Sequence, residues 1–169
     1  IITGITGQDG AYLSKFLIEK DYNVIGLTRS LENKFLGLKY LKIFNDINLI
    51  KYDHHKTNFW IDIINKYNPD EIYNLSSLSS VALSFKNPSE TLKSNFYLFQ
   101  DLLDAVSNSN TDIKIFQASS SEMFGNPSDE LINENTIMNP ISPYGFSKSL
   151  SHNILIYYRK YKNVFVSSG

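Results

Sequence analysis

Four polar residues in the second half of the chain have the types and the spacing that acid–base chemistry requires. Ser120 and Glu122 follow an apolar run, and Tyr144 and Lys148 stand four residues apart within residues 143–148, which read Pro-Tyr-Gly-Phe-Ser-Lys. A helix over this segment would place Tyr144 and Lys148 on one face. A neighbouring ammonium and an oxidised nicotinamide would both stabilise a tyrosine phenolate, so Tyr144 could remove a proton from an alcohol at neutral pH.

The other three residues have expected roles beside the tyrosine. Lys148 would also hydrogen-bond the cofactor ribose, and the Ser120 hydroxyl would orient the substrate alcohol. Removal of a proton from a carbon next to a carbonyl calls for a positioned carboxylate, which suits Glu122. Taken singly, a Tyr-x-x-x-Lys pair is more often helix packing, and a loop glutamate can simply cap a turn. Their order after a glycine-rich turn and a serine cluster favours a cofactor-using enzyme.

The glycine-rich turn lies at the front of the chain, where residues 1–10 read Ile-Ile-Thr-Gly-Ile-Thr-Gly-Gln-Asp-Gly. Such glycines allow a tight turn, close approach to a pyrophosphate and close helix packing, so this pattern indicates a dinucleotide-binding site. The helix N-terminus would then face the anion. The spacing alone also fits an ordinary strand–turn–helix corner. We expect the cofactor to contact Gly4, Thr6, Gly7, Gln8, Asp9 and Gly10.

Residues at the ends of the following strands indicate which cofactor is bound. Many NAD enzymes carry an acidic residue about 20 residues beyond the glycines, whereas this chain has Arg29 at the tip of its second expected strand. Arginine can pair with a 2′-phosphate, which favours NADP, although a solvated loop arginine is the alternative. Asp53 could cap a helix or touch the adenine, and Leu75 ends the fourth expected strand. The adjacent His54 and His55 lack a nearby third ligand, so no metal site is expected.

Alternating strands and helices would position these residues. Besides the strand that enters the glycine turn, strands are expected at residues 23–28, 48–52, 71–75, 114–118 and 164–169, and helices at 11–20, 58–67, 88–107 and 143–161. Residues 31–46 are expected to form a loop with one helical turn, and 76–87 a serine-rich loop. The expected buried faces are Leu13, Phe16 and Leu17 on the first helix and Leu92, Phe96, Phe99, Leu103 and Val106 on the third. The pattern predicts a single α/β domain over residues 1–169, a doubly wound parallel sheet with helices on both faces and ligands beyond the carboxyl ends of the strands.

Composition excludes several classes of function. The 169 residues are 42% hydrophobic and include 16 basic and 17 acidic residues, for a net charge of −1 with no long run of one sign. Neither nucleic acid nor a membrane surface is therefore expected as a partner. No run is apolar enough to cross a bilayer, and the absence of cysteine rules out thiolate catalysis and fits a cytoplasmic protein. The chain opens without methionine and stops as a strand finishes, so we interpret it as a fragment.

Several segments together resemble the GDP-mannose 4,6-dehydratase family of extended short-chain dehydrogenases. They are residues 3–13, 71–75, 117–125 and 142–145, and the Gln8-Asp9 pair is more specific than the glycines. The resemblance implies a Rossmann-like fold, NADP and the conversion of GDP-mannose to GDP-4-dehydro-6-deoxy-mannose. Tyr144 would deprotonate the sugar 4-hydroxyl while hydride leaves C4 for NADP. Glu122 would then take the C5 proton as water leaves C6, and the same hydride would return to C6. In this family Ser120 would assist at the 4-oxygen and Lys148 would support Tyr144, and members form dimers or tetramers.

The chain departs from the family pattern at two places. The family has an Ala-Gln-Ser-His-Val-like run after the fourth strand, where residues 76–81 read Ser-Ser-Leu-Ser-Ser-Val, and after the third strand only Asp53 carries over. The chain also ends before the C-terminal lobe that holds the GDP-sugar in the family. Two alternatives remain open: another nucleotide-sugar 4,6-dehydratase or 4-epimerase of the superfamily, and a cofactor-binding domain that is inactive on its own.

Overall fold

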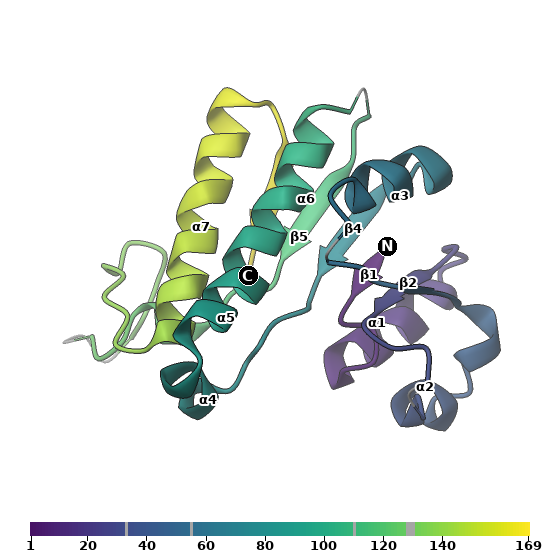
Figure 1. Cartoon of the computed structure of the whole chain (residues 1–169), viewed down its shortest axis with the longest axis horizontal. Helices are drawn as coiled ribbons and strands as arrows, with labels where there is room; N and C mark the ends of the chain where they lie inside the picture. The colour runs from purple at the N-terminus through teal and green to yellow at the C-terminus, as the bar shows by residue number, and fades with distance from the viewer. Residues whose placement is uncertain (33, 55, 110, 128–130) are drawn as a thin grey trace.

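Six short strands form one parallel sheet in the computed structural model, which describes residues 1–32, 34–54, 56–109, 111–127 and 131–169 (Figure 1). The strand order is β3-β2-β1-β4-β5-β6. The order therefore reverses between β1 and β4, and the predicted doubly wound parallel sheet is confirmed. The strands are β1 (Ile2–Thr3), β2 (Ile25–Thr28), β3 (Asn48–Lys51), β4 (Glu71–Asn74), β5 (Lys114–Gln117) and β6 (Phe165–Ser168).

Helices cover both faces of the sheet. On one face, α1 (Gln8–Ile18) and α2 (Leu36–Tyr40) pack over a cluster that includes Ile2 and Ile5. On the other face, α3 (Phe59–Tyr67), α6 (Leu98–Ser107) and α7 (Pro143–Tyr161) pack over a second cluster that includes Leu27, Ile72 and Ile115. Strand side chains alternate between these two clusters, as the period of an extended strand requires.

The first helix begins three residues earlier than expected, and of its expected buried face Leu17 is buried and Leu13 half-buried. It starts at Gln8, directly after the glycine turn, and buries Ala11, Ser14 and Leu17. The expectation for Phe16 is wrong, because its side chain is 53% exposed and lies under the Lys20 ammonium group, 4.9 Å from the ring centroid. The earlier start matters for function, since it brings the N-terminus of α1 to the turn.

The long helix expected over residues 88–107 is interrupted by a π-helical turn. It consists of α5 (Pro88–Leu92), the π turn η2 (Lys93–Tyr97) and α6. The π turn shifts the helical register, so Thr91 and Asn95 are buried where Leu92 and Phe96 were expected, and the latter two are half-buried. The expected apolar stripe is confirmed beyond the turn, at Phe99, Leu103 and Val106.

The two expected loops contain short helices. Residues 31–46 hold α2 and the 3₁₀ turn η1 (Phe44–Asp46), close to the single turn expected there. The serine-rich segment holds α4 (Val81–Lys86), so the expectation of a loop is wrong for that part. Its start is set by Ser80, whose hydroxyl accepts a hydrogen bond from the Leu83 backbone N–H at 3.2 Å. Its apolar side chains point to solvent and give no amphipathic pattern.

Candidate active site

A cavity of about 500 Å³ opens at the carboxyl ends of the central strands, where the strand order reverses. Ligands of doubly wound sheets bind at such a switch point. Eight residues proposed from the sequence line this cavity: Gly4, Thr6, Gly7, Asp9, Arg29, Leu75, Tyr144 and Lys148. The structure thus brings the glycine turn, the tip of β2 and the Tyr-x-x-x-Lys pair together from distant parts of the chain.

At two positions the glycine turn leaves no room for a side chain. Gly4 has a φ of +66°, and a Cβ there would lie 2.9 Å from the Ser76 backbone nitrogen. A Cβ on Gly10 would lie 2.5 Å from the Gly4 carbonyl oxygen, so Gly10 allows close helix packing and does not line the cavity. Gly7 donates its N–H to the same carbonyl at 2.9 Å. The open turn and the N-terminus of α1 fit the pyrophosphate of a dinucleotide.

Helix α7 presents the tyrosine and the lysine to the cavity. The Ser142 hydroxyl caps the helix by accepting a hydrogen bond from the Gly145 N–H at 3.0 Å, and Pro143 occupies the first helical position. Tyr144 is 8% exposed and Lys148 is 4% exposed. The Lys148 Nζ lies 5.8 Å from the Tyr144 ring centroid, so the two side chains share one face of the helix as predicted.

Lys148 is buried and hydrogen-bonded to a backbone carbonyl. Its Nζ donates a hydrogen bond of 3.0 Å to the carbonyl oxygen of Ala118, at the end of β5. Burial lowers the pKa of Lys148 from 10.5 to about 8, because desolvation disfavours the ammonium form. A buried lysine with a lowered pKa beside a tyrosine in a cleft is typical of a functional site.

Ser120 and Glu122 lie in a turn that packs against the helix of Tyr144, and neither lines the cavity. They belong to the turn that follows β5, where Ser120 precedes the 3₁₀ helix η3 (Ser121–Met123) and its hydroxyl accepts a hydrogen bond from the Glu122 N–H at 3.2 Å. This turn packs on the first turn of α7 at Gly145, where any side chain would overlap the Glu122 carbonyl oxygen. Both residues are half-buried. The neighbouring Ser119 lines the cavity instead.

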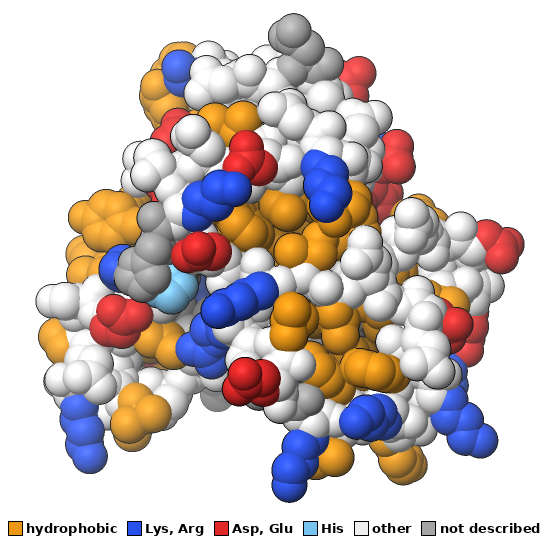
Figure 2. Space-filling view, turned by 45° about the vertical axis from the view of Figure 1, so that its right-hand side comes forward, with side chains coloured by type: hydrophobic (Ala, Val, Ile, Leu, Met, Phe, Trp, Pro, Cys, Tyr) orange, Lys and Arg blue, Asp and Glu red, His pale blue; other side chains and the backbone are white. Residues whose placement is uncertain are grey.

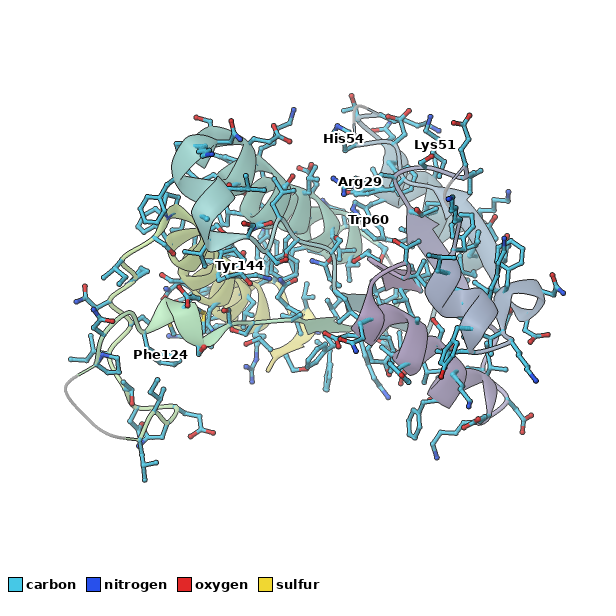
Figure 3. All side chains as sticks on the ribbon, turned by 90° about the horizontal axis from the view of Figure 1, so that it is seen from below. Arg29, Lys51, His54, Trp60, Phe124 and Tyr144 are labelled. Carbon is cyan, nitrogen blue, oxygen red and sulfur yellow. The ribbon has the colours of Figure 1, made fainter. Side chains whose placement is uncertain are left out.

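The opposite end of the cavity carries Arg29 and His54. In Figure 3 these two side chains lie on one side of the site and Tyr144 lies on the other. Asp53 lines a second cavity of about 330 Å³, which adjoins the first at Tyr52 and His54. Gln8 is exposed outside the cavity lining. Arg29 therefore lines the main cavity, as expected for a cofactor contact, whereas neither Asp53 nor Gln8 does.

Comparison with known proteins assigns the chain to a family. The family model described as GDP-mannose 4,6 dehydratase matches residues 1–169, which is the whole chain. The chain belongs to the GDP-mannose 4,6-dehydratase family. It is 37% identical over 184 residues to GDP-mannose 4,6 dehydratase 1 of Arabidopsis thaliana and 35% identical over 178 residues to GDP-mannose 4,6 dehydratase of Homo sapiens. These alignments cover all of this chain but 50% and 48% of the two relatives, so the chain spans about half their length.

Solved structures of related enzymes share the fold of this family member. UDP-glucose 4-epimerase from Thermotoga maritima matches with a TM-score of 0.87 at 22% identity, and dTDP-glucose 4,6-dehydratase from Streptomyces venezuelae with 0.86 at 20%. Each alignment covers 99% of this chain and 53% of the solved chain. The Rossmann-like fold is thereby confirmed, and at these identities the likeness concerns the fold alone.

A buried asparagine in the π turn, not among the residues expected from the sequence, links the cavity to helix α7. The Asn95 amide accepts a hydrogen bond from the Leu78 N–H at 2.8 Å and donates to the Leu78 carbonyl at 3.2 Å and the Ser147 hydroxyl at 3.0 Å. Leu78 belongs to the segment that departs from the family pattern and that lines the cavity. The signal available in the sequence was Thr91 and Asn95, two polar residues at helical spacing in an apolar segment.

Two further classes of site find no support among the described residues. They contain no group of three or more His, Asp or Glu side chains that could hold a metal ion, and His55 lies outside them. No helix in these segments is both long and apolar enough to cross a membrane. On the face shown in Figure 2, basic and acidic side chains are interspersed, with hydrophobic patches between them.

Proposed function

We propose that this chain is the cofactor-binding and catalytic half of a GDP-mannose 4,6-dehydratase. The enzyme would convert GDP-mannose to GDP-4-dehydro-6-deoxy-mannose, a lyase reaction that eliminates water across C5 and C6. One observation carries the proposal: Tyr144 and Lys148 line the same cavity as the glycine turn, in a chain that the family model matches throughout. If Tyr144 and Lys148 served only to pack the helix, they would not need to line a cavity together with the glycine turn.

The proposed catalytic roles follow from the chemistry of the four side chains. Tyr144 would take the proton of the sugar 4-hydroxyl, and the Lys148 ammonium would stabilise the phenolate and hydrogen-bond the ribose. Ser120 would hydrogen-bond the 4-oxygen. Once C4 is a ketone, the C5 proton is acidic, and Glu122 would remove it as water leaves C6. The half-buried position of Glu122 beside the first turn of α7 supports this role.

We propose NADP as the cofactor, held by the glycine turn at one end and by Arg29 at the other. When bound, this cofactor supplies the hydride chemistry, accepting hydride from C4 and returning it to C6. The N-terminus of α1 and the backbone of the turn would bind the pyrophosphate. Arg29 would pair with the 2′-phosphate through its guanidinium fork, and its place in the cavity lining supports NADP over NAD.

We also propose that the full-length protein is a cytoplasmic homo-oligomer, a dimer or a tetramer, whose substrate is held in part by a C-terminal lobe. The support is the family membership and the half-length match to relatives that are named GDP-mannose 4,6 dehydratase. Sedimentation of the full-length protein would measure its oligomeric state.

The decisive experiment incubates the full-length protein with GDP-mannose and NADP and follows the sugar by NMR and mass spectrometry. We expect a product lighter than the substrate by one water, with a 4-keto and a 6-methyl group and no net change in reduced cofactor. Loss of the 4-hydroxyl configuration without loss of water would instead indicate a 4-epimerase. Cofactor binding without any turnover of GDP-mannose would contradict the proposed activity and favour a binding domain.

A further inference from the structure

A row of hydrogen-bonded side chains crosses three neighbouring strands at the cavity, whose lining includes the first residue of the row, Thr3. Thr3, Asn74 and Gln117 are the last residues of β1, β4 and β5, and the register pairs Thr3 with Asn74 and Asn74 with Gln117. The Thr3 hydroxyl donates to Asn74 Oδ1 at 2.6 Å, and Asn74 Nδ2 donates to Gln117 Oε1 at 2.6 Å. All three side chains are buried, with exposed fractions of 1%, 7% and 2% in that order.

The row ends on the carbonyl group that holds the lysine. Gln117 Nε2 donates to the Ala118 carbonyl oxygen at 3.1 Å, and Lys148 Nζ donates to the same oxygen at 3.0 Å. At its other end, the Ser76 backbone N–H donates to the Thr3 hydroxyl at 3.1 Å. A continuous path of hydrogen bonds therefore joins the segment after β4 to the ammonium group on α7.

Chemistry fixes the direction of this path. A backbone carbonyl can only accept, so the Gln117 amide must turn its NH₂ group toward Ala118 and its oxygen toward Asn74. Asn74 must then present its NH₂ group to Gln117 and its oxygen to Thr3 and Ser76, whose hydroxyls both donate to it, at 2.6 and 3.2 Å. Only one orientation of the two side-chain amides gives every donor and acceptor in the row a partner. Amides aligned in this way polarise one another, which strengthens their hydrogen bonds.

We propose that Gln117, held in orientation by Asn74, is a positioning residue for Lys148, acting through the Ala118 carbonyl oxygen that both side chains share. Two donors on one oxygen fix where that oxygen points, and the oxygen in turn fixes the ammonium group beside Tyr144. The row also clamps β1 to β4 and β5 across the switch point, so that the glycine turn and the lysine keep a constant separation. This assignment deepens the proposed function and rests on it, since it presumes that Lys148 acts on the cofactor and the tyrosine.

The test measures Lys148 itself, without substrate or turnover. Gln117→Glu keeps the shape of the side chain but places a carboxylate at the shared oxygen, beside the ammonium group. Because both side chains contact the same carbonyl oxygen, the added negative charge would lie close to the ammonium group and should raise the pKa of Lys148 by at least about 1. The ¹³Cε shift of Lys148 is followed against pH in the chain labelled with ¹³C-lysine, and the signal is assigned by its loss in Lys148→Met. The other ionisable groups that line the cavity near Lys148, among them Asp9, Glu90, Lys93 and Tyr144, are unchanged by the substitution.

A second variant tests the direction of the row. In Asn74→Asp the side chain can no longer donate, so the Gln117 amide can no longer satisfy both its neighbour at position 74 and the Ala118 carbonyl oxygen. If it gives up the Ala118 contact, Lys148 becomes the sole side-chain donor to that oxygen, and the added carboxylate in the row acts in the same direction, so the pKa of the lysine should again rise. This variant decides the question if Gln117→Glu does not fold. The matched control is Gln100→Glu on α6, the same chemical change outside the row, for which we expect no more than a small shift.

An unchanged Lys148 pKa in a folded Gln117→Glu or Asn74→Asp chain would overturn the proposal. An equal rise in Gln100→Glu would do so as well, because it would mean that any added charge produces the effect. A shift in Lys148 without any dehydratase activity in the full-length protein would instead leave the positioning intact and count against the proposed function.

Discussion

Gly145 on helix α7 packs so closely on Glu122 that a methyl group on its Cα would overlap the Glu122 carbonyl oxygen. Two segments whose contacting residues are 23 positions apart in the chain are thereby held in backbone contact, with a proposed base on each. Gly145 lies between Tyr144, its chain neighbour, and the η3 turn that carries Glu122. The position of the η3 backbone relative to the first turn of α7 is therefore set by this close packing.

Gly145→Ala should push the η3 turn away from α7. We expect a loss of stability of about 1–3 kcal/mol from overpacking and at least a tenfold fall in kcat, since displacements of about 1 Å at a reacting group can cost 100-fold. NADPH affinity should change only a few-fold, because the glycine turn is elsewhere. Gly37→Ala on α2 is the control, since a Cβ there meets only the Ala11 methyl at 3.3 Å. Normal turnover in Gly145→Ala would show that this contact does not set the site.

Tyr144→Phe should lower turnover at least about 100-fold, the usual effect of removing a general base. The ring that packs in the cavity remains, so NADPH binding should stay within a few-fold of the original. Steady-state kinetics with GDP-mannose and a fluorescence titration measure the two quantities. Tyr157→Phe, a half-exposed tyrosine on the same helix, should leave both unchanged. A Tyr144→Phe enzyme with normal kcat would remove Tyr144 from the mechanism.

Glu122→Gln should separate the two halves of the reaction. Oxidation at C4 does not need the carboxylate, whereas loss of the C5 proton does, so reduced cofactor should accumulate. The measurement is the absorbance of NADPH after mixing enzyme, NADP and GDP-mannose in a single turnover. Glu134→Gln, an exposed glutamate of the loop before α7, should show no such accumulation. Complete conversion to product by Glu122→Gln would take away the main support for a dehydratase.

Arg29→Ala should reduce the preference for NADPH over NADH. We expect NADPH to bind about 10- to 100-fold more weakly, the loss of one charge-assisted pair with a phosphate, and NADH affinity to stay nearly constant. Fluorescence titrations of the chain with both cofactors give the ratio. Lys51→Ala is the matched control, because Lys51 is exposed at the end of β3, does not line the cavity and is labelled beside Arg29 in Figure 3. Equal losses for both cofactors would contradict a 2′-phosphate contact.

Much of this fold could be predicted because local pattern and tertiary structure agree. Short apolar runs bounded by turn residues located every strand to within two residues, and the rule that ligands bind at strand ends located the cavity. The spacing of Tyr144 and Lys148 was sufficient to place both on one face, since helix geometry alone decides it.

The remaining features depend on contacts between distant segments. The π turn at Asn95 satisfies a hydrogen-bond network with Leu78 and Ser147, and no local propensity announces it. The row from Thr3 to Gln117 exists only once the strand register is known. An apolar side chain need not be buried, which is why the expectation for Phe16 is wrong. Exposed aromatic rings are common at protein surfaces, and this one lies under the Lys20 ammonium group.

Lys148 should make the stability of the chain depend on pH in a direction that its burial determines. Its pKa is lowered from 10.5 to about 8 in the folded state. Between these two values the unfolded chain holds a proton that the folded chain has released, so the free energy of unfolding contributed by this group rises with pH. Below pH 8 both states are protonated, and the cost of burying the ammonium group is at its largest.

Lys148→Met should therefore stabilise the protein at pH 7 while it abolishes activity. The gain should be at most about 3 kcal/mol, from the size of the pKa shift, and it should shrink as the pH rises from 7 to 10. Urea unfolding of both chains at several pH values measures the difference, and the titrations of buried tyrosines cancel in it. Lys160→Met, at an exposed position on the same helix, should give a small difference that does not vary with pH. A pH-independent gain in Lys148→Met would mean that the pKa of the lysine is not lowered in the folded chain, because its hydrogen bond to Ala118 offsets the desolvation of the ammonium group.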